Sequence, residues 1–232
     1  MSVPDMTATN ASLPETVLHE TNPTTVSARR RAVAGFIAAL GFFGLAIQLV
    51  SSTLYFHDFG HALWGMARYY TNIGNLIVAI CMAGLALGRP WAARPMIIGG
   101  ATLNAALIGI VYAVLLGGHH NPGESYTAMV LLHRVVPPLI ALFWLALVPR
   151  GGLRWVDPIA WGVPPLVYLP YALLRGEMDG RFPYFFIDLA RLGWLPTLRN
   201  AALLTLAFML VGALMVWLDK ALAARRSAVP AP

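Results

Sequence analysis

Six long apolar runs divide this chain, and they constrain its fold more than any other feature. A helix needs roughly 20 apolar residues to cross the hydrocarbon core of a bilayer. Only 11% of the residues are charged, whereas a soluble domain carries about a quarter. We therefore predict an all-α, polytopic membrane protein with six transmembrane helices in one domain, residues 29–222. The predicted helices are Ala32–Ser51, Tyr69–Leu87, Met96–Leu116, Thr127–Val148, Trp155–Leu174 and Thr197–Leu218.

Basic residues are distributed unevenly between the two sides of this predicted bundle. The side that holds both termini carries Arg29, Arg30, Arg31, Arg89, Arg94, Arg150, Arg154, Lys220, Arg225 and Arg226. The other side carries Arg68, Arg175, Arg181, Arg191 and Arg199, mixed with Asp58, Glu124, Glu177, Asp179 and Asp188. Membrane proteins keep their excess of Lys and Arg on the cytoplasmic side. We therefore predict a multi-pass membrane protein with both termini cytoplasmic, and we assign the net charge of +6 to membrane orientation rather than to nucleic-acid binding.

The two ends of the chain lie outside the predicted helices. Residues 1–28 are rich in Thr, Pro and Ser, a composition typical of disorder, and residues 223–232 form a predicted cytoplasmic tail. The single cysteine, Cys81, lies within the second predicted helix and has no partner for a disulfide within the chain. The sequence gives no reason to expect a cofactor or a bound metal.

His133 and Arg134 lie inside the fourth apolar run, where ionisable side chains are costly unless they face a partner or a water-filled cavity. Pro137 and Pro138 follow. Each proline removes an amide donor and frees a carbonyl one turn earlier, and freed carbonyls persist in a membrane only where protein or water satisfies them. The pattern predicts a hydrated pocket at His133, which makes this residue a candidate functional group.

Thr71 opens the second predicted helix, just below the outer interface, and lies at a depth similar to that of His133. A hydroxyl becomes a useful nucleophile when a base removes its proton, and imidazole is the usual base near neutral pH. Asn72 and Asn75 follow on the same helix and are candidates to stabilise an oxyanion. The spacing is also consistent with a purely structural role, because threonine and asparagine in membrane helices often bond to neighbouring backbone.

Other polar residues are expected near the same outer mouth. Arg134 and Arg175 are candidates to hold a carboxylate head group, and Tyr112 lies towards the outer end of the third predicted helix. The stretch from Pro183 to Asp188 is aromatic and amphipathic, and we expect it to lie at the interface or to cover the pocket, with Tyr184 and Asp188 facing the site.

Three stretches resemble the six-span androgen-induced-protein family and its bacterial relatives. They are Tyr70-Thr71 at the start of a helix, His133-Arg134-Val135-Val136-Pro137-Pro138, and Phe182-Pro183-Tyr184-Phe185-Phe186-Ile187-Asp188 followed by Gly193. Their order and the six-span plan cover nearly the whole chain beyond residue 30.

Mammalian members of that family are threonine hydrolases that cleave fatty acid esters of hydroxy fatty acids inside the membrane. The resemblance implies that Thr71 is the nucleophile and His133 the base, with membrane lipids and a lipid-like ester as partners. This chain departs from the mammalian pattern at Arg134, Asn72 and Asn75, which makes the predicted pocket more polar.

Several alternatives remain open at this point. His57 and His61 are four residues apart beside Asp58, and a metal site there needs a third ligand. His119 and His120 precede Asn-Pro-Gly, a turn signal. A haem bundle needs paired histidines within helices. The fifth predicted helix carries Pro158, Pro164, Pro165 and Pro170 and must be kinked; a transporter would fit such a broken helix but normally shows an internal repeat. A non-enzymatic membrane scaffold or binding protein is the other class that fits.

Overall fold

The computed structural model describes residues 26–117 and 122–227, and every regular element in these ranges is a helix. The α-helices are α1 (Ala28–Phe56), α2 (Phe59–Ala67), α3 (Tyr70–Ala86), α4 (Pro95–Val111), α5 (Tyr126–Met129), α6 (Val136–Leu147), α7 (Asp157–Trp161), α8 (Val163–Asp179), α9 (Leu189–Leu192) and α10 (Trp194–Ser227). Two π-helices, η1 (Tyr112–Leu116) and η2 (Val130–Val135), and one 3-10 helix, η3 (Phe185–Ile187), complete the set. Residues 1–25 of the predicted N-terminal segment, the tail beyond Ser227, and the pair His119 and His120 lie outside the described residues.

Four helical segments are long and apolar enough to cross a membrane, namely Ala28–Phe56, Pro95–Leu116, Tyr126–Leu147 and Trp194–Arg226. They correspond to the first, third, fourth and sixth predicted helices. A fifth is obtained if α2 and α3, which meet at 90°, count as one bent span. The all-helical class is therefore confirmed, with four or five helices of membrane length, and the number six stays a prediction.

The fifth predicted helix differs most from expectation. Trp155–Leu174 was expected to be one kinked span, whereas the structure divides it at Gly162 into the short α7 and the 17-residue α8. Pro164 and Pro165 occupy the first turn of α8, where a missing amide leaves no hydrogen bond unmade, while Pro170 lies in its interior. The prolines at the start of α8 thus explain why the helix breaks at Gly162. By its length alone, α8 is too short to cross a membrane.

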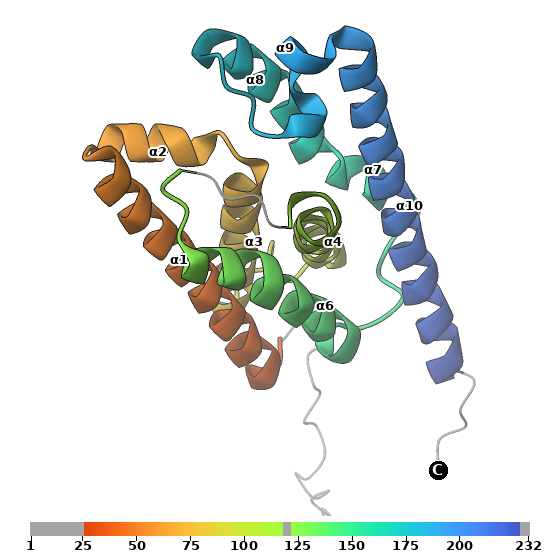
Figure 1. Ribbon diagram of the computed structural model, residues 1–232. Coiled ribbons are helices and arrows are strands. Elements are labelled where there is room, and N and C mark those ends of the chain that lie inside the picture. The colour runs from red at the N-terminus through yellow and green to blue at the C-terminus, as the bar shows by residue number, and fades with distance from the viewer. Residues whose placement is uncertain (1–25, 118–121, 228–232) are drawn as a thin grey trace, which may run out of the picture.

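The core lies among α1, α3, α4 and α6, which pack side by side (Figure 1). Ile37, Val78, Leu103 and Ile140, one from each of these helices, are almost completely inaccessible. In contrast, α10 forms the edge of the molecule and turns many large apolar side chains outward, including Leu198, Leu203, Leu206, Leu210, Leu214 and Trp217. Such a helix is typical of a face that contacts lipid.

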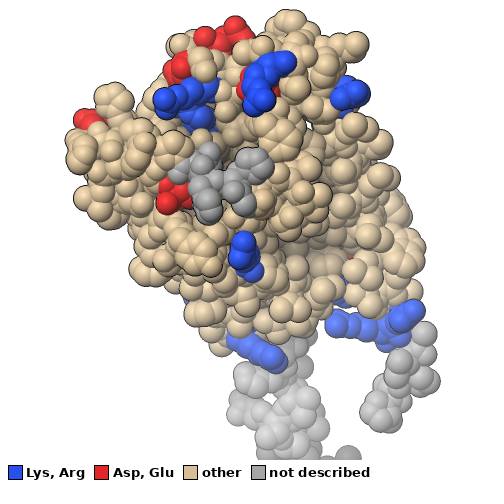
Figure 2. All heavy atoms as spheres, in the orientation of Figure 1, with Lys and Arg blue, Asp and Glu red and all other residues tan. Residues whose placement is uncertain are grey.

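The two described ends of the chain lie at the same end of the bundle, where α1 begins and α10 stops (Figure 1). The segments α2, α8 and α9 gather at the opposite end. Figure 2 shows basic residues at the first end, basic and acidic residues mixed at the second, and a largely uncharged surface between them. This distribution is compatible with a membrane location.

Candidate active site

Thr71 is the second residue of α3, directly after the sharp bend that separates α2 from α3. The preceding Tyr69 is extended and its side chain does not cap the helix, so amides of the first turn must find partners elsewhere. The Thr71 amide donates to the hydroxyl of Tyr184, with a nitrogen–oxygen distance of 3.3 Å. The start of α3 is thereby joined to a loop more than a hundred residues further along the chain.

His133 lies in the π-helix η2, immediately before the helix-opening prolines of α6. Pro137 and Pro138 have no amide hydrogen, so the regular ladder is interrupted where the sequence predicts. The His133 Nδ1 atom is 3.1 Å from the carbonyl oxygen of Met129. Because a carbonyl only accepts, this contact assigns the proton to Nδ1 and leaves Nε2 with a free lone pair. A neutral imidazole in this tautomer can act as a base through Nε2.

Tyr112 faces His133 from the other π-helix, η1, with ring centroids 4.4 Å apart. The two residues therefore meet where both the third and the fourth apolar helices leave α-geometry. Single turns of π-helix are rare and occur often at functional sites, because the extra residue re-aims side chains. Arg134 also lies near Tyr112, with its guanidinium carbon 5.8 Å from the centre of the Tyr112 ring.

Thr71 and His133 line the same polar cavity, which has a volume of about 580 Å³. Tyr112, Tyr184, Asn72 and Asp188 also line it, so six of the predicted site residues meet in one place. The remaining charged or titratable lining groups are His61, Arg68, Tyr69, Glu124 and Arg181. The cavity lies at the end of the bundle that carries α2 and the loop after α8, opposite the described chain ends.

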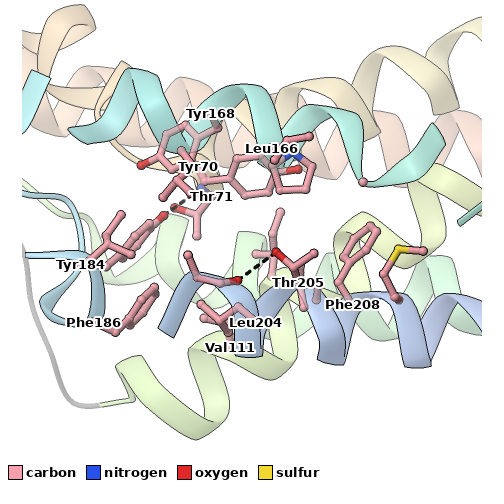
Figure 3. A pocket seen from close by; sticks show the side chains of 18 of the residues that line it. Tyr70, Thr71, Val111, Leu166, Tyr168, Tyr184, Phe186, Leu204, Thr205 and Phe208 are labelled. Atoms are coloured by element: carbon pink, nitrogen blue, oxygen red, sulfur yellow. Dashed lines mark hydrogen bonds between the residues drawn. The ribbon is translucent and has the colours of Figure 1, made fainter. Parts of the chain in front are cut away.

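A second, apolar pocket of about 310 Å³ lies between α8 and α10 (Figure 3). Its walls are aliphatic and aromatic side chains, among them Val111, Leu166, Leu204, Phe208 and Met209. Three residues line both this pocket and the polar cavity, namely Thr71, Leu116 and Tyr184. Thr71 therefore stands at the boundary between a polar and an apolar compartment.

The loop after α8 covers this boundary. Its Phe182 ring packs so closely on Gly176 of α8 that a Cβ there would overlap the ring. Tyr184 is buried and stacks on Phe186 with ring centroids 5.1 Å apart. Burial raises the pKa of Tyr184 to about 12, although hydrogen bonds with Thr71 work against this shift. The hydroxyl beside Thr71 consequently stays protonated at neutral pH, and the predicted covering role of Pro183–Asp188 agrees with this packing.

Three predicted site residues do not line either compartment. Asn75 is buried, and its amide donates to the Thr71 carbonyl at 2.8 Å. Arg134 is exposed beside Tyr112. Arg175 is buried, and its guanidinium lies 3.8 Å from the centre of the Trp64 ring. The sequence places these residues at about the right depth, but the rotation of each helix turns their side chains away from the cavity.

Arg175 instead joins α8 to α2. It donates to the carbonyl of Trp64, to the Tyr171 hydroxyl at 2.8 Å and to Asp179 at 3.1 Å, while Arg68 reaches Asp179 at 2.8 Å. Burial alone would raise the pKa of Asp179, but the hydrogen bond from Arg175 and the positive charges of Arg68 and Arg175 hold it below its usual value. This ion cluster holds α2 against α8 at the edge of the cavity, which Arg68 also lines.

Asp58, His61 and the oxyanion candidate Asn72 have local partners. Asp58 caps α2 through the His61 amide and lies 2.8 Å from the His61 ring. Asn72 donates to the Met66 carbonyl at 3.0 Å. Within residues 26–117 and 122–227, no group of three or more His, Cys, Asp or Glu side chains is arranged to hold a metal ion.

Sequence reasoning missed the apolar pocket entirely. Apart from Thr71 and Tyr184, most of its lining residues are apolar side chains, many of them on α4, α8 and α10, that have the appearance of ordinary lipid-facing or core positions in the sequence. The one sequence signal for this pocket was the group of prolines around Gly162, which predicts a break in the helix; the structure has this break between α7 and α8.

Comparison of the chain with protein-family models, with curated proteins and with solved structures finds no match in any of the three. The chemistry of the site must therefore be argued from its own geometry.

Proposed function

We propose that the protein is an intramembrane hydrolase that cleaves a lipid-like ester, with Thr71 as the nucleophile and His133 as the base. One observation carries the proposal: Thr71 lines both a polar cavity that contains His133 and an apolar pocket that could hold a hydrocarbon chain. An ester bond joins an apolar and a polar part, and its carbonyl would lie at such a boundary. The same pair of residues is the one that the family resemblance implies.

The reaction would proceed through an acyl-enzyme. The Thr71 oxygen attacks the ester carbonyl carbon while its proton passes to Nε2 of His133. The tetrahedral intermediate collapses, the bond to the alcohol oxygen breaks, and the alcohol leaves with that proton. A water molecule from the polar cavity then attacks the acyl-Thr71 carbonyl and gives its proton to His133. The acid leaves, and Thr71 recovers a proton from the imidazolium.

Two donors would serve the oxyanion that forms during both steps, once the Thr71 amide exchanges its bond to the Tyr184 hydroxyl for one to the substrate. The Thr71 amide lies in the first turn of α3, where the helix dipole is positive. The neutral Tyr184 hydroxyl lies beside it. A developing negative charge at this point would be stabilised by a backbone amide and a phenol, without any metal ion. These two groups replace Asn72 and Asn75, the donors expected from the sequence.

The proposed placement in the membrane has six crossings, both termini cytoplasmic and the polar cavity on the outer side of a bacterial plasma membrane. It is supported by the excess of basic residues near the chain ends. It is also supported by the common end of the bundle at which α1 begins and α10 stops. Water for the second step would enter from the outer aqueous phase.

Labelling with a fluorophosphonate probe tests the proposal directly. The purified protein in detergent should form a covalent adduct, and Thr71→Ala and His133→Ala should each abolish it. Thr53→Ala is a matched threonine control, because its hydroxyl only bonds to the Leu49 carbonyl of its own helix. His57→Asn is a matched histidine control, because His57 has a positive φ of 54° that Asn tolerates well. Folded protein that takes up no probe would contradict the proposed function.

A further inference from the structure

The two compartments that meet at Thr71 differ in what they can hold. The apolar pocket presents aliphatic and aromatic walls from α4, α8 and α10. Its few polar atoms are already engaged, as in Thr205, whose hydroxyl donates to the Ala201 carbonyl at 2.9 Å (Figure 3). A pocket without free hydrogen-bonding groups accepts a hydrocarbon chain. It disfavours a polar group, because that group would lose its hydrogen bonds to water and gain none from the protein.

The polar cavity favours polar groups over a hydrocarbon chain. Arg68, Arg181, Glu124 and Asp188 line it, and His133 lies in its wall. A second long alkyl chain would have to displace water from these charged groups, which is unfavourable. A small alcohol that carries hydroxyl or charged groups can hydrogen-bond there instead. Only one half of a bound ester would therefore lie in a hydrocarbon environment, namely the half in the apolar pocket.

The apolar pocket is also accessible from the surface that faces lipid. Leu166 of α8 lines the pocket and is still 65% exposed, and Thr205 of α10 is exposed as well. A chain could therefore enter sideways between α8 and α10 without leaving a hydrocarbon environment. The polar cavity, in contrast, lies under the loop after α8, beside the charged end of the bundle.

We propose that the substrate is an ester with one hydrocarbon chain, whose acyl chain lies in the pocket between α8 and α10 and whose small polar alcohol lies in the cavity beside His133. This assignment rests on the proposed function and deepens it, because it states which half of the ester goes where. It distinguishes the protein from a hydrolase for esters that carry long chains on both sides. It also makes the wall of the apolar pocket a determinant of chain length.

Ala201 is the position at which that wall can be changed most simply. It lies on α10 and lines the pocket, whereas its neighbour Ala202 is exposed and does not. Ala201→Phe should fill part of the pocket, and Ala202→Phe adds the same ring to the outer face of the same helix. Leu166→Trp narrows the pocket from α8 and gives a second variant if Ala201→Phe folds poorly.

The kinetic test uses p-nitrophenyl esters from butanoate to hexadecanoate. In Ala201→Phe, the ratio of kcat/KM for the longest to the shortest ester should fall about tenfold to a hundredfold relative to wild type, because two or three methylenes lose their burial. The ratio should stay at the wild-type value in Ala202→Phe. An unchanged ratio in both pocket variants, with hydrolysis still dependent on Thr71, would overturn the subsite and leave the hydrolase standing.

The alcohol half is tested by comparing a glycerol monoester with a hexadecyl ester of the same fatty acid. The glycerol monoester should be cleaved at least tenfold faster. Equal rates would contradict the assignment of the polar cavity to the alcohol.

A binding measurement separates failure of this inference from failure of the proposed function. A fatty acid with a diazirine at its chain end, applied to the Thr71→Ala protein in detergent, should label pocket residues of α8 and α10. Excess unmodified fatty acid should suppress this labelling, and so should Ala201→Phe. Suppressible labelling without any ester hydrolysis would refute the hydrolase while supporting the chain site. Labelling that is confined to other surfaces would refute the chain site.

Discussion

The helices around α3 and the pair formed by α8 and α10 are built in different ways. On the first side, α1, α3, α4 and α6 interlock closely enough that a Cβ on Gly109 of α4 would lie 2.9 Å from the Pro137 ring of α6. On the second side, α8 and α10 leave a pocket of about 310 Å³ between them. Dense packing resists rearrangement, so the first side can hold His133 and Tyr112 in register. The second side can admit a ligand, and Thr71 and Tyr184 lie where the two sides meet.

The strongest test of this division is the removal of the proposed reacting groups. Thr71→Ala and His133→Ala should each lower kcat/KM for ester hydrolysis by roughly a thousandfold or more, because a hydroxyl without its base is a poor nucleophile. Thr71→Ser should keep part of the activity, since it retains the hydroxyl. Initial rates of purified protein with a glycerol monoester measure this. Substantial activity in Thr71→Ala would place the chemistry elsewhere.

The close packing of α4 against α6 can be tested at Gly109. We expect Gly109→Ala to destabilise the protein by about 1–3 kcal/mol, because the added methyl meets a rigid proline ring rather than a flexible side chain. Gly35→Ala is the matched control, since its Cβ would lie 3.4 Å from the Ala86 methyl, an ordinary contact. Unfolding followed by tryptophan fluorescence in detergent measures both. Equal stability of the two variants would show that this side is more adaptable than we infer.

A smaller effect is expected within the packed side, where hydrogen bonds join α3 to α4. Tyr70 donates to the side chain of Asn104 at 2.7 Å, and Asn104 in turn donates to the Gly74 carbonyl at 3.0 Å. Tyr70→Phe leaves the buried Asn104 oxygen without this donor and should cost about 1–2 kcal/mol of unfolding free energy. Tyr126→Phe, at an exposed position, should change nothing measurable. The same fluorescence assay compares them.

The smallest expected effect concerns the ion cluster that holds α2 against α8. The pKa of Asp179 is held below its usual value, so its stabilising contribution is present above the unfolded pKa of about 3.9 and is lost as the pH falls through the lower folded value. Asp179→Asn should therefore lower Tm slightly at pH 6 and flatten the acid limb of the Tm profile. Thermal unfolding between pH 3 and 6, compared with Glu177→Gln, would reveal this. Identical profiles for wild type and Asp179→Asn would show that the cluster adds no stability.

Much of the site could be predicted because its residues carry strong local signals. A histidine inside an apolar run, followed by two prolines, points to a distorted helix and a hydrated pocket, and η2 lies there. Thr71 at the start of a helix and the aromatic loop around Tyr184 were found in the same way. Arg175, by contrast, was expected to bind substrate and instead contacts Trp64 and Asp179.

The sequence by itself determined where the four long apolar helical segments lie, because apolar length, glycine and proline act locally and need no partner to have their effect. It also determined which residues are unusual in an apolar setting, among them Thr71 and His133. The tertiary structure alone decided that Tyr184 covers Thr71, that Arg175 turns towards α2, and that a pocket opens between α8 and α10. These features depend on the tilt and rotation of each helix, which packing against its neighbours sets rather than the apolar length of any one segment.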